Sequence, residues 1–186
     1  LSPEAIRIAR ETANKIKVSA EFICCDLYSL PTQHQKQYDI VFSSYGTIGW
    51  LPDIKRWASI VNQFLNPGGL FVFAEFHPAM WMFNNELTEV TYSYFNSSCI
   101  DETEATTYTG QQEEKPFRSI TWNHGLAEVM QALLNEGLQL EIFQEFDYSP
   151  YHISSHMEEF SPGRYRYTHL ANKLPLVYAL RMRKPL

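Results

Sequence analysis

The chain has 186 residues, of which 45% are hydrophobic and 19% are charged. This length and balance predict one globular domain with a core of its own. The net charge is −6, and proteins that bind nucleic acids generally present a basic field to the phosphates. We therefore expect no nucleic-acid partner.

Neither a signal peptide nor an apolar run of about 18 residues is visible, so we expect a cytoplasmic protein with no membrane span. The three cysteines, Cys24, Cys25 and Cys99, fit a reducing compartment and lack the spacing of a metal site. The sequence therefore predicts no bound metal.

The first elements in chain order alternate between helices and strands. The opening residues predict a helix, because Ser2 can cap it and Pro3 suits its first position. A short apolar run over residues 20–25 predicts a buried strand. Strands over residues 38–44 and 70–76 flank a helix that runs from 52 to about 65. These last three elements predict a parallel strand pair with a right-handed crossover.

The middle of the chain, residues 77–119, is polar, aromatic and irregular. We interpret residues 78–119 as an insert or cap over the active site of a single domain that covers residues 1–186. Rings at Tyr92, Tyr94 and Phe95 alternate loosely, which allows a short antiparallel hairpin.

The last part of the chain predicts a helix over residues 125–136 and strands over 138–146 and 175–182. An irregular loop over 147–172 is expected between these two strands. Because a loop rather than a helix joins them, we expect an antiparallel pair at the edge of the sheet.

Polar side chains follow each of the first three predicted strands. Ligands bind at the carboxyl ends of the strands in open parallel sheets. Asp26 follows the first strand, Ser44 and Tyr45 follow the second, and Glu75 and His77 end the third. Asp26 can bind an exocyclic amine of adenine or simply cap the next turn, and its position alone leaves both readings open.

Two histidines are candidate general bases. His77 stands at a strand exit and His124 just before a predicted helix, and imidazole exchanges protons near neutral pH. A structural hydrogen-bonding role is the alternative for each. The sequence contains no nucleophile elbow, no phosphate-binding loop and no G-x-G-x-x-G fingerprint.

Four segments, in this order and spacing, resemble the class I S-adenosylmethionine-dependent methyltransferases. They are LSPEAI with ARE (1–6 and 9–11), DL with LP (26–27 and 30–31), YDIV with LPD (38–41 and 51–53), and LNPGGL (65–70). Four further runs resemble one branch of small-molecule-type members: WNH (122–124), ALLNEGL (132–138), YSPY (148–151) and LPL (174–176).

The resemblance implies an α/β, Rossmann-like methyltransferase sheet with the strand order 3-2-1-4-5-7-6 and an irregular insert after the fifth strand. It also implies that the family's first two strands and first helix, with the glycine-rich loop, are missing from this chain. We therefore expect an N-terminally incomplete domain. Its exposed sheet edge would favour a homodimer.

The resemblance further implies methyl transfer from S-adenosylmethionine to a small-molecule acceptor without a metal. It places Asp26 and Leu27 against the adenine, and Ser44 and Tyr45 near the methionine part. His77 and the insert would face the acceptor.

Aromatic side chains complete the expected site. Trp50 is a ring that can attract the sulfonium by a cation–π interaction. The rest of the acceptor pocket is hypothesised to contain Tyr92, Tyr94, Trp122, His124, Tyr148 and Tyr151. Plain packing is the alternative for every ring. The alternative functions are a non-catalytic methyltransferase-like protein that binds a ligand or a partner, and a nucleotide-dependent enzyme of different chemistry.

Overall fold

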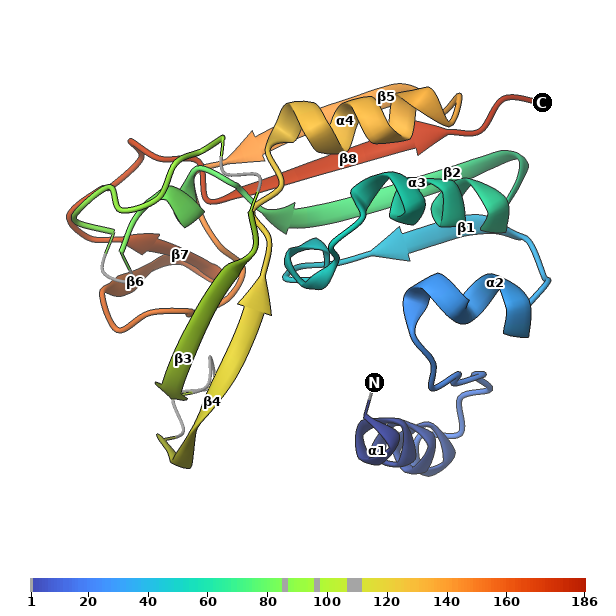
Figure 1. Cartoon of the computed structure of the whole chain (residues 1–186), viewed down its shortest axis with the longest axis horizontal. Helices are drawn as coiled ribbons and strands as arrows, with labels where there is room; N and C mark the ends of the chain where they lie inside the picture. The colour runs from blue at the N-terminus through green and yellow to red at the C-terminus, as the bar shows by residue number, and fades with distance from the viewer. Residues whose placement is uncertain (1, 85–86, 96–97, 107–111) are drawn as a thin grey trace. The chain divides into compact units, whose positions relative to one another are not determined.

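The computed structural model describes residues 2–84, 87–95, 98–106 and 112–186 (Figure 1). The chain divides into two compact units, residues 1–36 and residues 37–186. The expected insert over 78–119 lies partly outside the described residues, at 85–86, 96–97 and 107–111. The single-domain organisation stays a prediction.

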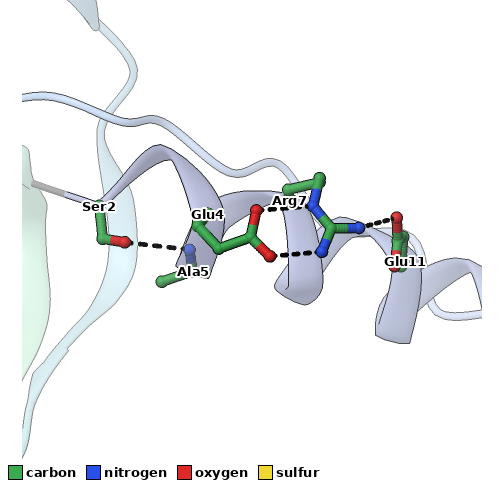
Figure 2. Close-up of polar contacts among 5 residues, drawn as sticks. All are labelled: Ser2, Glu4, Ala5, Arg7 and Glu11. Carbon is green, nitrogen blue, oxygen red and sulfur yellow. Dashed lines mark hydrogen bonds and ion pairs between the residues drawn. The ribbon is translucent and has the colours of Figure 1, made fainter.

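The first unit opens with helix α1 (Pro3–Lys15), as predicted. The Ser2 hydroxyl accepts the Ala5 N–H at 3.1 Å and so satisfies one of the free amides at the helix start. One turn further on, Arg7 donates to Glu4 from Nε at 2.8 Å (Figure 2). This ion pair is exposed, so it adds little to stability.

The predicted strand over residues 20–25 is wrong. These residues have no regular secondary structure. A strand needs a neighbour to pair its backbone groups, and none of the described strands pairs with this segment. A 3-10 turn, η1 (Leu27–Ser29), and the short helix α2 (Leu30–Gln33) follow.

The second unit contains a central sheet with the strand order β1-β2-β8-β5. Its strands are β1 (Tyr38–Ser43), β2 (Leu65–Phe76), β8 (Val177–Arg183) and β5 (Gln139–Phe146). The parallel pairing of β1 with β2 and the antiparallel pairing of β5 with β8 are both confirmed. The seven-strand order that the resemblance implies stays a prediction.

Strand β2 begins at Leu65, earlier than the predicted residue 70, but the register with β1 shifts between Leu65 and Leu70, and Gly68 within this run has a φ of +79°. This irregular run needs glycine at position 69 for a steric reason. A Cβ atom on Gly69 would lie 2.9 Å from the Asn66 carbonyl oxygen and 3.1 Å from that of Tyr38 on β1. Only glycine lets the two backbones approach this closely.

Helices α3 (Ile54–Phe64) and α4 (Leu126–Asn135) lie on the same face of the sheet (Figure 1). Trp57 of α3 packs against Phe71 and Phe73 of β2, with ring centroids 5.7 and 5.3 Å away. All three side chains are buried. This apolar contact fixes the crossover between β1 and β2 and therefore the edge where both strands end.

Two hairpins lie outside the central sheet. Strands β3 (Ile100–Thr106) and β4 (Gln112–Thr121) pair antiparallel within the insert. This hairpin lies later than the one expected around residues 92–95. Strands β6 (Met157–Ser161) and β7 (Arg164–Tyr167) also pair antiparallel. The prediction of an irregular loop over 147–172 is therefore wrong.

The β6–β7 hairpin is stabilised by a small hydrophobic core separate from the main one. Its buried members come from both segments that were expected to be irregular and from the residue just before β8: Met80, Leu87, Met157, Tyr167 and Leu176. Because Met80 belongs to the 3-10 turn η3 (Met80–Met82) that follows β2, this core ties the hairpin to the exit of that strand.

Candidate functional site

The exits of the parallel strands β1 and β2 lie side by side and are joined through one carboxylate. Glu75, the second-to-last residue of β2, accepts N–H groups from the loop after β1: Gly46, Thr47 at 2.9 Å and Ile48 at 3.3 Å. Only 4% of Glu75 is exposed. The loop is therefore tied to the end of β2.

The other bonds of this carboxylate are also made with uncharged groups. The Phe76 N–H donates at 2.8 Å, and the Thr47 hydroxyl lies 3.3 Å away. Within the described part of the chain, the negative charge of Glu75 is thus balanced by peptide and hydroxyl dipoles rather than by a cationic side chain.

Two of the predicted site residues meet at this edge. The ring of Tyr45 lies 5.3 Å from that of Tyr151 and 5.6 Å from that of Phe76. Burial raises the pKa of Tyr45, and the neighbouring Tyr151 adds to the effect. At neutral pH, Tyr45 therefore offers an uncharged ring and a hydroxyl donor.

The segment before α4 lies alongside the same loop. The Trp122 N–H donates to the Gly49 carbonyl at 2.9 Å, and His124 Nε2 lies 2.8 Å from the Leu51 carbonyl oxygen. Tyr94 reaches the start of α4, where its hydroxyl accepts the Leu126 N–H at 3.1 Å. The structure thus brings Trp122 and His124 to the β1 exit.

Each candidate histidine uses both ring nitrogens. His77 Nδ1 accepts the Ala79 N–H at 3.1 Å, so Nε2 carries the proton and donates to Glu145 at 2.9 Å. Burial lowers the pKa of His77, although the bond to Glu145 opposes this. His124 bonds Glu128 through its second nitrogen at 3.0 Å. These contacts supply the structural role that was the alternative, and catalysis by either residue stays a prediction.

The remaining predicted cofactor residues have simpler surroundings. Asp26 caps η1 by accepting the Tyr28 N–H at 2.8 Å, so the capping role left open by the sequence is the one the structure shows. Asp26 and Leu27 belong to the first unit. Ser44 is half-buried in the β1 loop, and Trp50 is 58% exposed. Their contacts with a cofactor stay predictions.

Two further predicted acceptor residues, Tyr92 and Tyr148, make contacts outside the β1 loop, although Tyr148 also contributes to the raised pKa of Tyr45. Tyr92 donates its hydroxyl to Glu102 on β3, which raises the pKa of Tyr92. Tyr148 packs beside the β6–β7 hairpin, where the Arg164 guanidinium lies 4.7 Å from its ring centre. Neither contact is one that the sequence indicates.

Glu75 is the residue whose role the sequence did not reveal, although its place at the end of the third predicted strand was evident. The sequence signal that could have revealed this role is the alternation of buried and half-buried positions along β2. Phe71, Phe73 and Glu75 occupy successive buried positions, so a carboxylate stands where the pattern predicts an apolar side chain.

A hollow of about 310 Å³ lies at the carboxyl end of β5. Its lining is mixed in charge: Glu145, Phe146, Asp147, Asn172, Lys173 and Pro175. Among the described residues, no three histidine, cysteine or acidic side chains converge to hold a metal ion. None of the described helices is long and apolar enough to cross a membrane.

Comparison with known proteins finds a family match over part of the chain and a shared fold. Residues 1–69 match the family model of a methyltransferase domain. No curated protein matches the chain in sequence.

Solved structures share the fold over nearly the whole chain. An S-adenosylmethionine-dependent methyltransferase from Mesorhizobium loti has a TM-score of 0.60 at 20% identity, over 98% of this chain and 77% of its own. One from Clostridium acetobutylicum has a TM-score of 0.62 at 13% identity, over 100% and 73%.

A third solved structure is the geranyl diphosphate C-methyltransferase from Streptomyces coelicolor. It has a TM-score of 0.59 at 10% identity, over 99% of this chain and 62% of its own. The family match at residues 1–69 and this shared fold confirm the resemblance of the chain to the class I S-adenosylmethionine-dependent methyltransferases.

Proposed function

We propose that the protein transfers a methyl group from S-adenosylmethionine to a small-molecule acceptor at the exits of β1 and β2. The observation that carries this proposal is the pairing of Tyr45 and Tyr151 beside the buried carboxylate of Glu75. These groups stand at the carboxyl ends of two parallel strands, where α/β sheets bind ligands. The matched methyltransferase family supports the same chemistry.

The side chains at this edge fit a cationic methyl donor. S-adenosylmethionine supplies a methyl group that is already activated by the positive charge on sulfur. Aromatic faces attract cations, and Tyr45 and Tyr151 provide two of them.

The chain's own residues would align the two substrates and exclude water. We assign the donor to Ser44, Tyr45 and Trp50 of the second unit. We assign the acceptor to Tyr92, Tyr94, Trp122, Tyr148 and Tyr151. We propose His77 and His124 as the candidate general bases, with a structural role as the alternative because both ring nitrogens of each are bonded.

A small acceptor is supported by the relatives. The Streptomyces coelicolor enzyme was solved with geranyl diphosphate and S-adenosyl-L-homocysteine, so this fold accommodates a small acceptor beside the spent donor. The net charge of −6 also disfavours a nucleic-acid acceptor.

A calorimetric titration tests the proposal. We expect saturable binding of S-adenosylhomocysteine and no binding of NAD. Tyr45→Ala should weaken S-adenosylhomocysteine binding by about tenfold, because one aromatic surface that packs against the ligand is lost. Tyr38→Ala, at the other end of β1, is the matched control and should change affinity less than about twofold. Binding of NAD instead, or of neither ligand, would contradict the proposal.

The alternative function is that of a non-catalytic protein that binds a partner. The exposed lateral edge of the central sheet favours this alternative. Strand β1 is one of the two edge strands of the central sheet, and Ile40 and Phe42 on it are 62% and 63% exposed. Exposed apolar edge strands pair readily with other chains. Sedimentation should then show a homodimer that Phe42→Lys dissociates, whereas a protein that is monomeric without the substitution would remove this alternative.

A further inference from the structure

Glu75 collects an unusual number of donors from consecutive residues. Its Oε1 accepts N–H groups from Gly46 and Phe76, and its Oε2 accepts those of Thr47 and Ile48 together with the Thr47 hydroxyl. Three successive amides of one loop thus converge on one carboxylate. Such a concave set of amides forms an anion-binding nest, and here the anion is a side chain of the neighbouring strand.

The loop needs this anion to keep its shape. Gly46 has a φ of +71°, in the left-handed region that glycine adopts without strain. Without the carboxylate, the amides of Gly46, Thr47 and Ile48 would point toward one buried spot with no acceptor. Ile48 is buried whereas Gly46 and Thr47 are exposed, and an unpaired buried amide is costly, so the loop would rearrange to find other partners.

Stability alone does not explain an acid at this position. Phe71 and Phe73 fill the two preceding buried positions of β2, and both are fully buried. A buried carboxylate costs free energy that an apolar side chain would not. A buried carboxylate at this position is explained if the loop that it holds in place has a function.

We infer that Glu75 is a positioning residue for the methyl donor. Its carboxylate holds residues 46–48 in the conformation that places Tyr45 against Tyr151 and aligns Gly49 with Trp122. This inference rests on the proposed function and extends it, because Glu75 acts on the donor through the loop and not by touching it.

The test compares Glu75→Gln with Glu141→Gln. Glutamine keeps the shape of Glu75 but turns one acceptor oxygen into a donor that faces amide N–H groups. Glu141 on β5 of the same sheet bonds Arg181 and Arg183 and lies outside the proposed site, which makes it the matched control. Amide hydrogen exchange at residues 46–48 and the affinities for S-adenosylmethionine and S-adenosylhomocysteine are measured for each variant.

In Glu75→Gln, exchange at residues 46–48 should accelerate at least about tenfold, and both ligands should bind about tenfold more weakly. Equal losses are expected because a positioning residue affects the cationic donor and its neutral product alike. Glu141→Gln should leave all three quantities unchanged. If Glu75→Gln does not fold, Glu75→Asp keeps the charge one methylene short of the loop, and a smaller loss in the same quantities is expected.

Three results would overturn the inference. The first is unchanged exchange at residues 46–48 in a folded Glu75 variant. The second is unchanged affinity for both ligands. The third is weaker binding of S-adenosylmethionine alone, which would show that Glu75 acts by its charge on the ligand. If the unaltered protein binds neither ligand, the proposed function fails. If it binds both ligands and the Glu75 variant changes neither the exchange nor the affinities, only the inference about Glu75 fails.

Discussion

The loop after β1 and the β6–β7 hairpin flank the same strand exits, yet they are stabilised in opposite ways. The loop is fixed by hydrogen bonds to one carboxylate, that of Glu75. The hairpin is fixed by a small apolar core that includes Met157, Tyr167 and Leu176.

The two regions therefore differ in the substitutions that they can tolerate. Apolar packing depends mainly on buried area and accepts many side chains of similar volume. Amides that converge on a carboxylate accept only one geometry. We therefore expect changes at the hairpin core to affect chiefly stability, and changes at the loop to affect chiefly binding.

The largest effect is expected from Leu176→Ala in the hairpin core. Leu176 is 2% exposed, and truncating a buried leucine typically costs about 2–5 kcal/mol through lost burial and the cavity left behind. Denaturant unfolding measures the loss. The control is Leu134→Ala, because Leu134 is 44% exposed on α4. A cost below about 1 kcal/mol at Leu176 would show that this core does not stabilise the fold.

An intermediate effect is expected from Gly46→Ala in the loop. A Cβ there would meet only the Phe76 ring, at 4.0 Å, so the cost is the backbone strain of a φ of +71°, about 1–2 kcal/mol. Thermal unfolding and titration with S-adenosylhomocysteine should both respond. Gly49→Ala, whose Cβ would lie 3.7 Å from the Trp122 oxygen, is the control. Equal effects at both glycines would show that the positive φ of Gly46 adds no cost of its own.

A smaller effect should appear in the pH dependence of stability. Burial lowers the pKa of His77 below its usual 6.5, so the unfolded chain takes up this proton at a higher pH than the folded protein does. The contribution of His77 to stability is then complete above pH 6.5 and is lost as the pH falls below it.

Melting temperatures measured at pH 5.5 and 7.5 test this sign. In His77→Asn the fall in melting temperature on acidification should be shallower. The exposed His152 provides the control variant His152→Asn, which should behave like the unaltered protein. A steeper fall in His77→Asn would mean that the folded protein prefers the protonated ring.

The smallest effect, and one of opposite direction, is expected from Tyr178→Phe. Tyr178 pairs with Glu75 across the sheet and is fully buried, and its hydroxyl has no partner among the described residues. Removing an unpaired buried hydroxyl should leave the melting temperature unchanged or raise it slightly. A clear fall would indicate that the hydroxyl binds a group, such as an ordered water, in solution.

The elements with strong periodicity could be predicted from sequence. The β1–α3–β2 unit and the final antiparallel pair were confirmed, because consecutive apolar residues and the spacing of α3 are local signals. The strand over residues 20–25 was wrong, since an apolar run does not show whether a partner strand exists. The β6–β7 hairpin was missed because residues far apart in sequence, Met80 and Met157, supply its core.

The candidate site was predicted as far as strand direction determines it. Tyr45 and His77 follow β1 and β2, and parallel strands must end at the same edge. The hydrogen bonds of Glu75 could not be predicted from the sequence, because the convergence of three amides on one carboxylate is a property of the folded loop. The contact of Asp26, by contrast, is local and could be predicted. The sequence allowed either a cap or an adenine contact, and the structure shows the cap.

The most direct test of the central claim is amide hydrogen exchange across the whole chain with and without S-adenosylhomocysteine. We predict that the ligand slows exchange in residues 44–51 at the exit of β1, and that Glu75→Gln needs about tenfold more ligand for the same protection. Protection confined to the hollow at residues 145–147 and 172–175, or no protection anywhere, would contradict the account.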